Sequence, residues 1–169
     1  MKTLALITAF VAVQATAFGQ SDAGWRVVAD KQAGYSVSYP AQPQELSLPM
    51  QTEKAQLTLK GWALEQNGLA FIACSLKMPY STKGREDQMF AGALKGIMKK
   101  GKVLNQQSFT LHGSPGRTVL LQSPNGMVVR DTLVIRNGTL IQVATVSKPD
   151  QADSPMLAKF SGSFKFLGH

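Results

Sequence analysis

The sequence predicts an α+β fold in which an antiparallel β-sheet is flanked by helices on both faces, an α/β/α sandwich. Residues 117–147 have the pattern of three strands joined by two tight turns, and Asn137-Gly138 between two β-rich runs is typical of a two-residue hairpin. Residues 69–78 and 139–147 are almost continuously apolar, which indicates that both faces of these strands are covered. One long amphipathic segment, residues 86–100, provides a helix to cover them.

The N-terminus has the pattern of an export signal. A positively charged residue is followed by an apolar run from Leu4 to Val13, which suits a signal peptide and is too short to span a bilayer. Small residues favour cleavage after Ala17 or Gly19. We therefore expect a signal peptide over residues 1–19 and a single domain over residues 20–169. The mature protein is expected to be soluble and periplasmic or extracellular, and a buried N-terminal helix is the alternative interpretation.

The first half of the domain predicts four strands and one irregular segment. Residues 25–29 form a short β-rich run, and residues 35–39 alternate between large apolar side chains and serine, which is typical of a half-buried strand. Three prolines over residues 40–49 predict an extended, irregular segment, because proline cannot donate a hydrogen bond to a sheet. Residues 56–64 and 69–78 are expected to pair as a hairpin.

The principal helix is predicted over residues 86–100. Apolar residues recur along it at intervals of three and four and form one stripe that we expect to face the core: Met89, Phe90, Ala93, Leu94, Ile97 and Met98. Acidic residues in its first turn and lysines in its last turn suit the helix dipole, and Gly101 is a natural end.

Turn residues place the elements that follow this helix. The predicted strands cover residues 103–111, 117–122, 126–136 and 139–147. Ser154 and Pro155 are typical of a helix N-cap and first position, so a short helix is predicted over residues 155–161. Residues 163–167 are expected to end the domain as an extended segment held by two phenylalanines.

A basic patch is the first candidate interaction site. The chain has 18 Lys and Arg residues against 10 Asp and Glu residues, a net charge of +8. The one dense group of lysines lies at the end of the long helix: Lys95, Lys99, Lys100 and Lys102. Such a patch suits an acidic partner, and the alternative is a solvated helix end that matches the dipole. Aromatic residues do not interleave with the basic ones, so nucleic-acid binding is not predicted.

The second candidate interaction site is the pair Arg130 and Asp131 in the middle of the predicted meander. Asp131 shares a strand face with Val129, Leu133 and Ile135, and a buried carboxylate without a partner is costly. We expect that a lysine or arginine from a covering element, or an exposed strand end, stabilises Asp131.

The sequence contains no recognisable catalytic, metal or cofactor motif. Cys74 is the single cysteine and lies within an apolar strand, where we expect a small buried hydrophobe. His112 and His169 have no second ligand at metal-binding spacing. An enzyme would need Cys74, His112 and Asp131 to converge in one cleft. We therefore expect no enzymatic activity, no metal and no cofactor.

The order of these motifs resembles the PsbP-like superfamily. The resemblance rests on the segments GYSVSYPAQP, LHGSPGR, SPNG, RNGTLIQV and MLAKFSGSF, and it extends over residues 25–166. It implies an antiparallel sheet with helices packed on both faces, in an exported bacterial branch of the superfamily. It also implies a non-enzymatic protein that acts by binding other proteins. No residue here matches the positions through which better-known members bind their partners, so no specific role is transferred.

Three functions remain open at the level of the sequence. The first is an exported accessory protein that docks a protein partner in the cell envelope through a sheet edge or a helix surface. The second is a carrier of a small apolar molecule or lipid, with a pocket between sheet and helix lined by Trp62, Phe71 and Phe90. The third is an enzyme of unrecognised type. The sequence does not determine the oligomeric state.

Overall fold

The computed structural model describes residues 24–51, 56–98 and 101–168, and the expected signal peptide lies outside these residues. The described strands are β1 (Arg26–Asp30), β2 (Tyr35–Tyr39), β3 (Gln44–Gln51), β4 (Gln56–Gln66), β5 (Leu69–Lys77), β6 (Lys102–Leu111), β7 (Ser114–Gln122), β8 (Val128–Arg136), β9 (Thr139–Ser147) and β10 (Lys165–Phe166). The described helices are α1 (Glu86–Met98), the short 3-10 helix η1 (Pro149–Gln151) and α2 (Pro155–Gly162).

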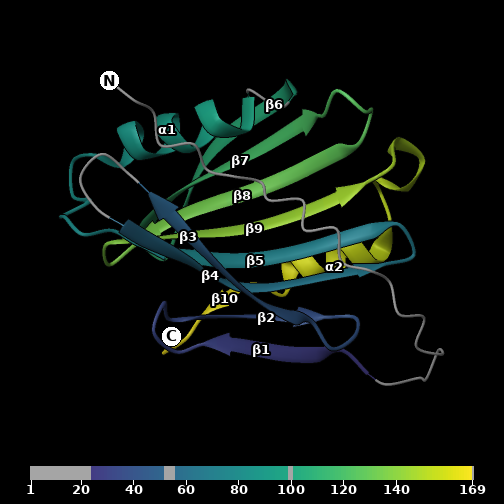
Figure 1. Ribbon diagram of the computed structural model, residues 1–169, viewed down its shortest axis with the longest axis horizontal. Coiled ribbons are helices and arrows are strands. Elements are labelled where there is room, and N and C mark those ends of the chain that lie inside the picture. Colours follow the sequence, from purple (N-terminus) through teal and green to yellow (C-terminus); the bar gives the residue numbers. More distant parts are fainter. Residues whose placement is uncertain (1–23, 52–55, 99–100, 169) are drawn as a thin grey trace.

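Seven strands form the main sheet in the order β3-β4-β5-β9-β8-β7-β6, and every neighbouring pair is antiparallel (Figure 1). Asn67 and Asn137 have φ angles of 55° and 48°, and each is followed by a glycine with positive φ. This conformation belongs to the two-residue hairpin turn that Asn-Gly predicts. β5 pairs with β9 at the centre of the sheet, with Ala73 opposite Val143. The predicted hairpin and the predicted meander are both confirmed.

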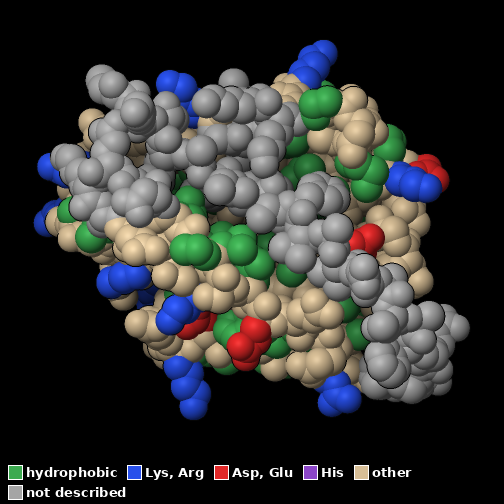
Figure 2. Space-filling view, in the orientation of Figure 1, with side chains coloured by type: hydrophobic (Ala, Val, Ile, Leu, Met, Phe, Trp, Pro, Cys, Tyr) green, Lys and Arg blue, Asp and Glu red, His purple; other side chains and the backbone are tan. Residues whose placement is uncertain are grey.

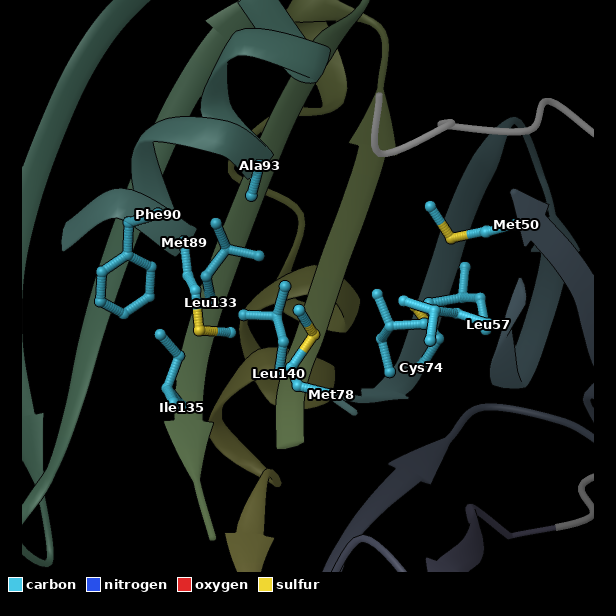
Figure 3. Packing of buried hydrophobic residues seen from close by; sticks show 12 residues of the cluster. Met50, Leu57, Cys74, Met78, Met89, Phe90, Ala93, Leu133, Ile135 and Leu140 are labelled. Atoms are coloured by element: carbon cyan, nitrogen blue, oxygen red, sulfur yellow. The ribbon is translucent and has the colours of Figure 1, made fainter. Parts of the chain in front are cut away.

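Helix α1 covers one face of the main sheet. Met89, Phe90 and Ala93 of this helix pack against Leu133 and Ile135 of β8 (Figure 3). These residues belong to the predicted apolar stripe, and the part of the stripe from Met89 to Leu94 faces the core as expected. The last two residues of the predicted helix lie outside the described part of the chain.

The opposite face of the main sheet is covered by a second, three-stranded sheet of β1, β2 and β10 together with α2. Phe160 of α2 is fully buried, and its ring centroid lies 5.0 Å from that of Tyr39 in β2 and 5.3 Å from that of Phe71 in β5. Both faces of the central strands are therefore covered, as their apolarity predicts. The described chain is nevertheless mostly β, and helical layers on both faces are not clearly formed, because an eight-residue helix is too short to cover a sheet of this width.

The prediction of an irregular segment over residues 40–49 is wrong. Strand β3 occupies most of this segment and pairs with β4, with Pro49 opposite Thr58. β3 is an edge strand, so only one of its sides needs hydrogen-bonding partners, and an edge strand tolerates proline where a central strand does not.

Candidate functional site

Asp131 is buried at the centre of the main sheet, with 1% of its surface exposed. Its partner is Gln142 on the adjacent strand β9, whose Nε2 donates a hydrogen bond of 2.7 Å to Asp131 Oδ2. Gln142 Oε1 in turn accepts a weak hydrogen bond from Cys74 Sγ on β5, at 3.7 Å. The expectation of a basic partner or an exposed strand end is thus wrong, because the neighbouring strand supplies an amide that the sequence order does not reveal.

Burial is the largest cause of the pKa shifts of Asp131 and Cys74. It raises the pKa of Asp131 from 3.8 to about 7, and the hydrogen bond from Gln142 opposes this rise only partly. Burial, followed by the nearby charge of Asp131, also raises the pKa of the Cys74 thiol far above its usual range. Cys74 is 1% exposed and behaves as the small buried hydrophobe that the sequence predicts.

The three residues that an enzyme would need do not share a cleft. His112 lies in the turn after β6, and its ring contacts Phe166 at a centroid distance of 6.3 Å. Asp131 is opposite Val119, five residues along β7 from the turn, which corresponds to roughly 16 Å at 3.3 Å per residue. Among the described residues no group of three or more His, Cys, Asp or Glu side chains is placed to hold a metal ion.

The residues expected to line an apolar carrier pocket are on opposite faces of the sheet. Trp62 and Phe71 pack on the face that α2 covers. Phe90 belongs to α1 and packs on the other face. A single pocket lined by these three side chains is therefore not formed, because the sheet itself separates them.

Two of the four candidate lysines lie in the described structure. Lys95 in the last turn of α1 and Lys102 at the start of β6 are both exposed, and Lys99 and Lys100 lie outside the described residues. Arg130 is exposed on the face opposite to buried Asp131, so these two neighbours do not act together. On the face drawn in Figure 2, Lys and Arg side chains are scattered along the margin.

Strand β6 forms one outer edge of the main sheet. Its inner side pairs with β7 at every residue except Leu104, and no strand in the described part of the chain pairs with its outer side. Seven of its ten residues are exposed and none is buried. A β-bulge at Leu104 interrupts the pairing near the start, and from Asn105 to Leu111 the register is unbroken. The ring of Phe109 packs on Gly116 of β7, where a Cβ atom would collide with it, and this contact holds β6 to the sheet.

The two edges of the main sheet differ in how far they are protected. β3 contains Pro49 and Glu45, and prolines and charges are common protection against pairing with another chain. β6 has no proline and no acidic residue, and its only charge is Lys102 at its first position. Its uncharged segment Asn105–Thr110 was predicted only as a strand, because a sequence pattern does not tell an edge strand from a central one. The one feature of the sequence that indicates an exposed edge is the lack of alternating apolar residues in Asn105–Ser108.

The overall architecture has a known counterpart. It is similar to the solution structure of cyanobacterial PsbP (CyanoP) from Synechocystis sp. PCC 6803, with a TM-score of 0.57, 11% sequence identity, and coverage of 90% of this chain and 98% of that chain. A second solved structure, the protein of unknown function PA94 from Pseudomonas aeruginosa, has a TM-score of 0.42 at 11% identity, over 62% of this chain and 84% of its own. The sequence matches no protein-family model and no curated protein. The chain therefore has a PsbP-like fold.

No helix among the described residues is long and apolar enough to cross a membrane.

Proposed function

We propose that this protein is an exported, non-enzymatic accessory protein that docks a protein partner in the cell envelope through the outer edge of β6. The observation that carries the proposal is the exposed edge strand β6, whose stretch Asn105–Leu111 has no charge, no proline and no bulge, and with whose outer side no strand among the described residues pairs. An extended segment of another chain pairs with such an edge by adding a strand to the sheet. The distance of His112 from the buried side chains of Cys74 and Asp131 supports the non-enzymatic part of the proposal.

The chemistry of the edge favours an extended partner segment with a polar middle and an acidic end. The unbroken stretch Asn105–Leu111 is long enough for several main-chain hydrogen bonds, each contributing about 1 kcal/mol net. Lys102 at the start of β6 and Lys95 at the end of α1 favour acidic residues next to the strand that is added. A second copy of this chain fits less well, because two mature molecules, each with a net charge of +7 after Lys2 is removed with the signal peptide, repel each other.

The export part of the proposal rests on the first 19 residues. When the full chain is expressed in a bacterium, the protein recovered from the periplasmic fraction is expected to begin at Phe18 or Gln20, as read by N-terminal sequencing. Recovery of the chain only in the cytoplasm with its first residues intact would contradict export.

The docking surface is tested by site-specific photocrosslinking. A photoreactive amino acid is placed at Gln106 on β6 and, as a matched control, at exposed Gln32 in the turn after β1. We expect position 106, but not position 32, to capture one envelope protein through a segment that mass spectrometry identifies. A synthetic peptide of that segment should then slow amide exchange in β6 and leave β3 unchanged. Equal capture at both positions, or capture of a second copy of the chain, would contradict the proposal.

Charge reversal tests the acidic character of the partner. The double variant Lys95→Glu and Lys102→Glu is expected to weaken binding of the captured peptide about three- to tenfold, since exposed ion pairs are individually weak. The measurement is titration calorimetry at low and moderate salt, with Lys31→Glu and Lys165→Glu as the matched double variant away from β6. If both double variants weaken peptide binding equally, the net charge of the protein and not the position of Lys95 and Lys102 determines the affinity, which would contradict the prediction.

A further inference from the structure

The face of the main sheet opposite to α1 is only partly covered. α2 and the small sheet pack on β5 and β9 of this face, and in Figure 1 they lie away from β6 and β7. On β9, Thr145 and Ser147 are buried, with 3% and 2% of their surfaces exposed. On the neighbouring strand β8, Val128 and Thr132 are half-buried and Arg130 is exposed. At this end of the sheet the cover therefore stops between β9 and β8.

The two faces of β7 differ in the same way. Val119 and Leu121 pack beneath α1 and are buried, whereas Thr118, Leu120 and Gln122 alternate to the other face and are half-buried. Residues directly opposite each other on neighbouring antiparallel strands share a face of the sheet. The residues of β6 that pair with the three half-buried positions of β7 are all exposed: Gln107, Asn105 and Lys102.

These outward side chains of β6, β7 and β8 together form a surface that we call the open face. None of them is buried and none is acidic. Lys102 and Arg130 are its two cations, and neither side chain has an ion pair or a hydrogen bond with any described residue. By contrast, Arg117 on the other face of β7 is paired with Asp87 of α1. The ammonium group of Lys102 and the guanidinium group of Arg130 are therefore available to a ligand.

The pairing register determines how far apart these two cations are. Lys102 is opposite Gln122, Gln122 is opposite Val128, and Arg130 follows two residues later on β8. Two strand spacings of about 4.8 Å and two residues of about 3.3 Å place the Cα atoms of Lys102 and Arg130 about 12 Å apart. Leu120 of the central strand β7 is opposite Arg130 and lies next to the line that joins the two cations. The open face thus has two positive charges with an apolar side chain between them.

We propose that the open face binds an extended acidic segment of a protein partner, with one carboxylate on Lys102, a second on Arg130 and an apolar side chain on Leu120. Residues four positions apart in an extended chain are about 13 Å apart and share a face, so two such carboxylates match the two cations. The residue midway between them then lies over Leu120. The guanidinium group of Arg130 offers the planar pair of donors that a carboxylate accepts. Because the open face has no acidic side chain, a negatively charged segment fits it better than a neutral or basic one.

The test titrates the purified protein at low salt with a seven-residue peptide that has glutamate at its second and sixth positions, valine at its fourth and threonine elsewhere. Amide chemical shifts are followed by NMR. We expect saturable shifts centred on Leu120 and Arg130, and about three- to tenfold weaker binding when glutamine replaces both glutamates, since two exposed ion pairs are lost. A peptide of the same composition with adjacent glutamates should bind about two- to threefold more weakly, because only one carboxylate reaches a cation.

Three results would overturn the proposal. The first is equal affinity for the glutamate peptide and either of its two comparison peptides. The second is a set of shifts that leaves Leu120 and Arg130 unchanged. The third is tighter binding of a single-stranded DNA of seven nucleotides, which would indicate a general site for polyanions.

One variant and its control connect the binding to Arg130. Arg130→Glu is expected to weaken binding of the glutamate peptide about three- to tenfold and to leave binding of the glutamine peptide unchanged. Arg26→Glu, at an exposed position on β1, changes the net charge equally and should bind as the unmodified protein does. Equal weakening by both variants would overturn the proposal. Arg130 takes no part in the proposed docking at the outer edge of β6, which uses main-chain groups, so either proposal can fail without the other.

Discussion

Replacing Asp131 with asparagine is expected to stabilise the protein at pH 8 by about 2–4 kcal/mol and to flatten the dependence of its stability on pH. Asp131 is 1% exposed, and its Oδ1 atom has no hydrogen-bond partner among the described residues. An ionised carboxylate in such a place is costly, and asparagine resembles the protonated acid in shape while carrying no charge. The hydrogen bond from Gln142 Nε2 can be kept, because the asparagine side chain also has a carbonyl oxygen.

The sign of the pH dependence follows from the direction of the pKa shift. Burial raises the pKa of Asp131 in the folded protein to about 7, against 3.8 in the unfolded chain. The folded state therefore retains a proton that the unfolded state has already released. The contribution of this group to stability is fully present below about pH 4 and is lost as the pH rises to about 7, a total of about 4 kcal/mol at 1.4 kcal/mol per pKa unit.

The measurement is urea unfolding of the two proteins at several values between pH 4 and pH 8. We expect the free energy of unfolding of the Asp131→Asn variant to fall less over this range than that of the original protein. Asp150→Asn, at an exposed position in η1, is the control and should show the original pH dependence. Parallel curves for the Asp131 variant and the original protein would contradict the assignment of a raised pKa to Asp131.

Replacing Phe160 with alanine is expected to destabilise the protein by about 3–5 kcal/mol, a large share of the 5–15 kcal/mol typical of a domain. Phe160 is fully buried, and its ring contacts Tyr39 of the small sheet and Phe71 of the main sheet. Its removal leaves a cavity where α2 and both sheets meet, so all three elements lose packing at once.

Urea unfolding at constant pH tests this prediction. Met156→Ala is the matched control, because Met156 lies on the same helix and is only partly buried. We expect it to cost about 1 kcal/mol, in keeping with the smaller apolar area it covers. An equal decrease in the free energy of unfolding for the two variants would contradict the prediction, because it would mean that partly buried residues such as Met156 stabilise the helix as much as Phe160 does.

Much of the fold is readable from local features of the sequence. Asn137-Gly138 and the apolar periodicity of residues 86–98 predict a hairpin and a helix, because turn conformation and amphipathic faces depend on neighbours only a few residues away. Pro155 marks the start of α2, and α2 indeed begins there. The PsbP-like architecture expected from the order of these motifs agrees with the similarity to CyanoP.

The sequence by itself determined both α-helices, the strands of the main sheet other than β3, and which residues share a face of these strands. Only the tertiary structure decided which strands lie at the edges, so Pro49 was misjudged and the exposure of β6 was not anticipated. It also decided that Gln142 faces Asp131 and that Phe160 packs between Tyr39 of the small sheet and Phe71 of the main sheet. The physical reason is that these contacts join strands and loops far apart along the chain, whereas propensity and periodicity act over a few residues.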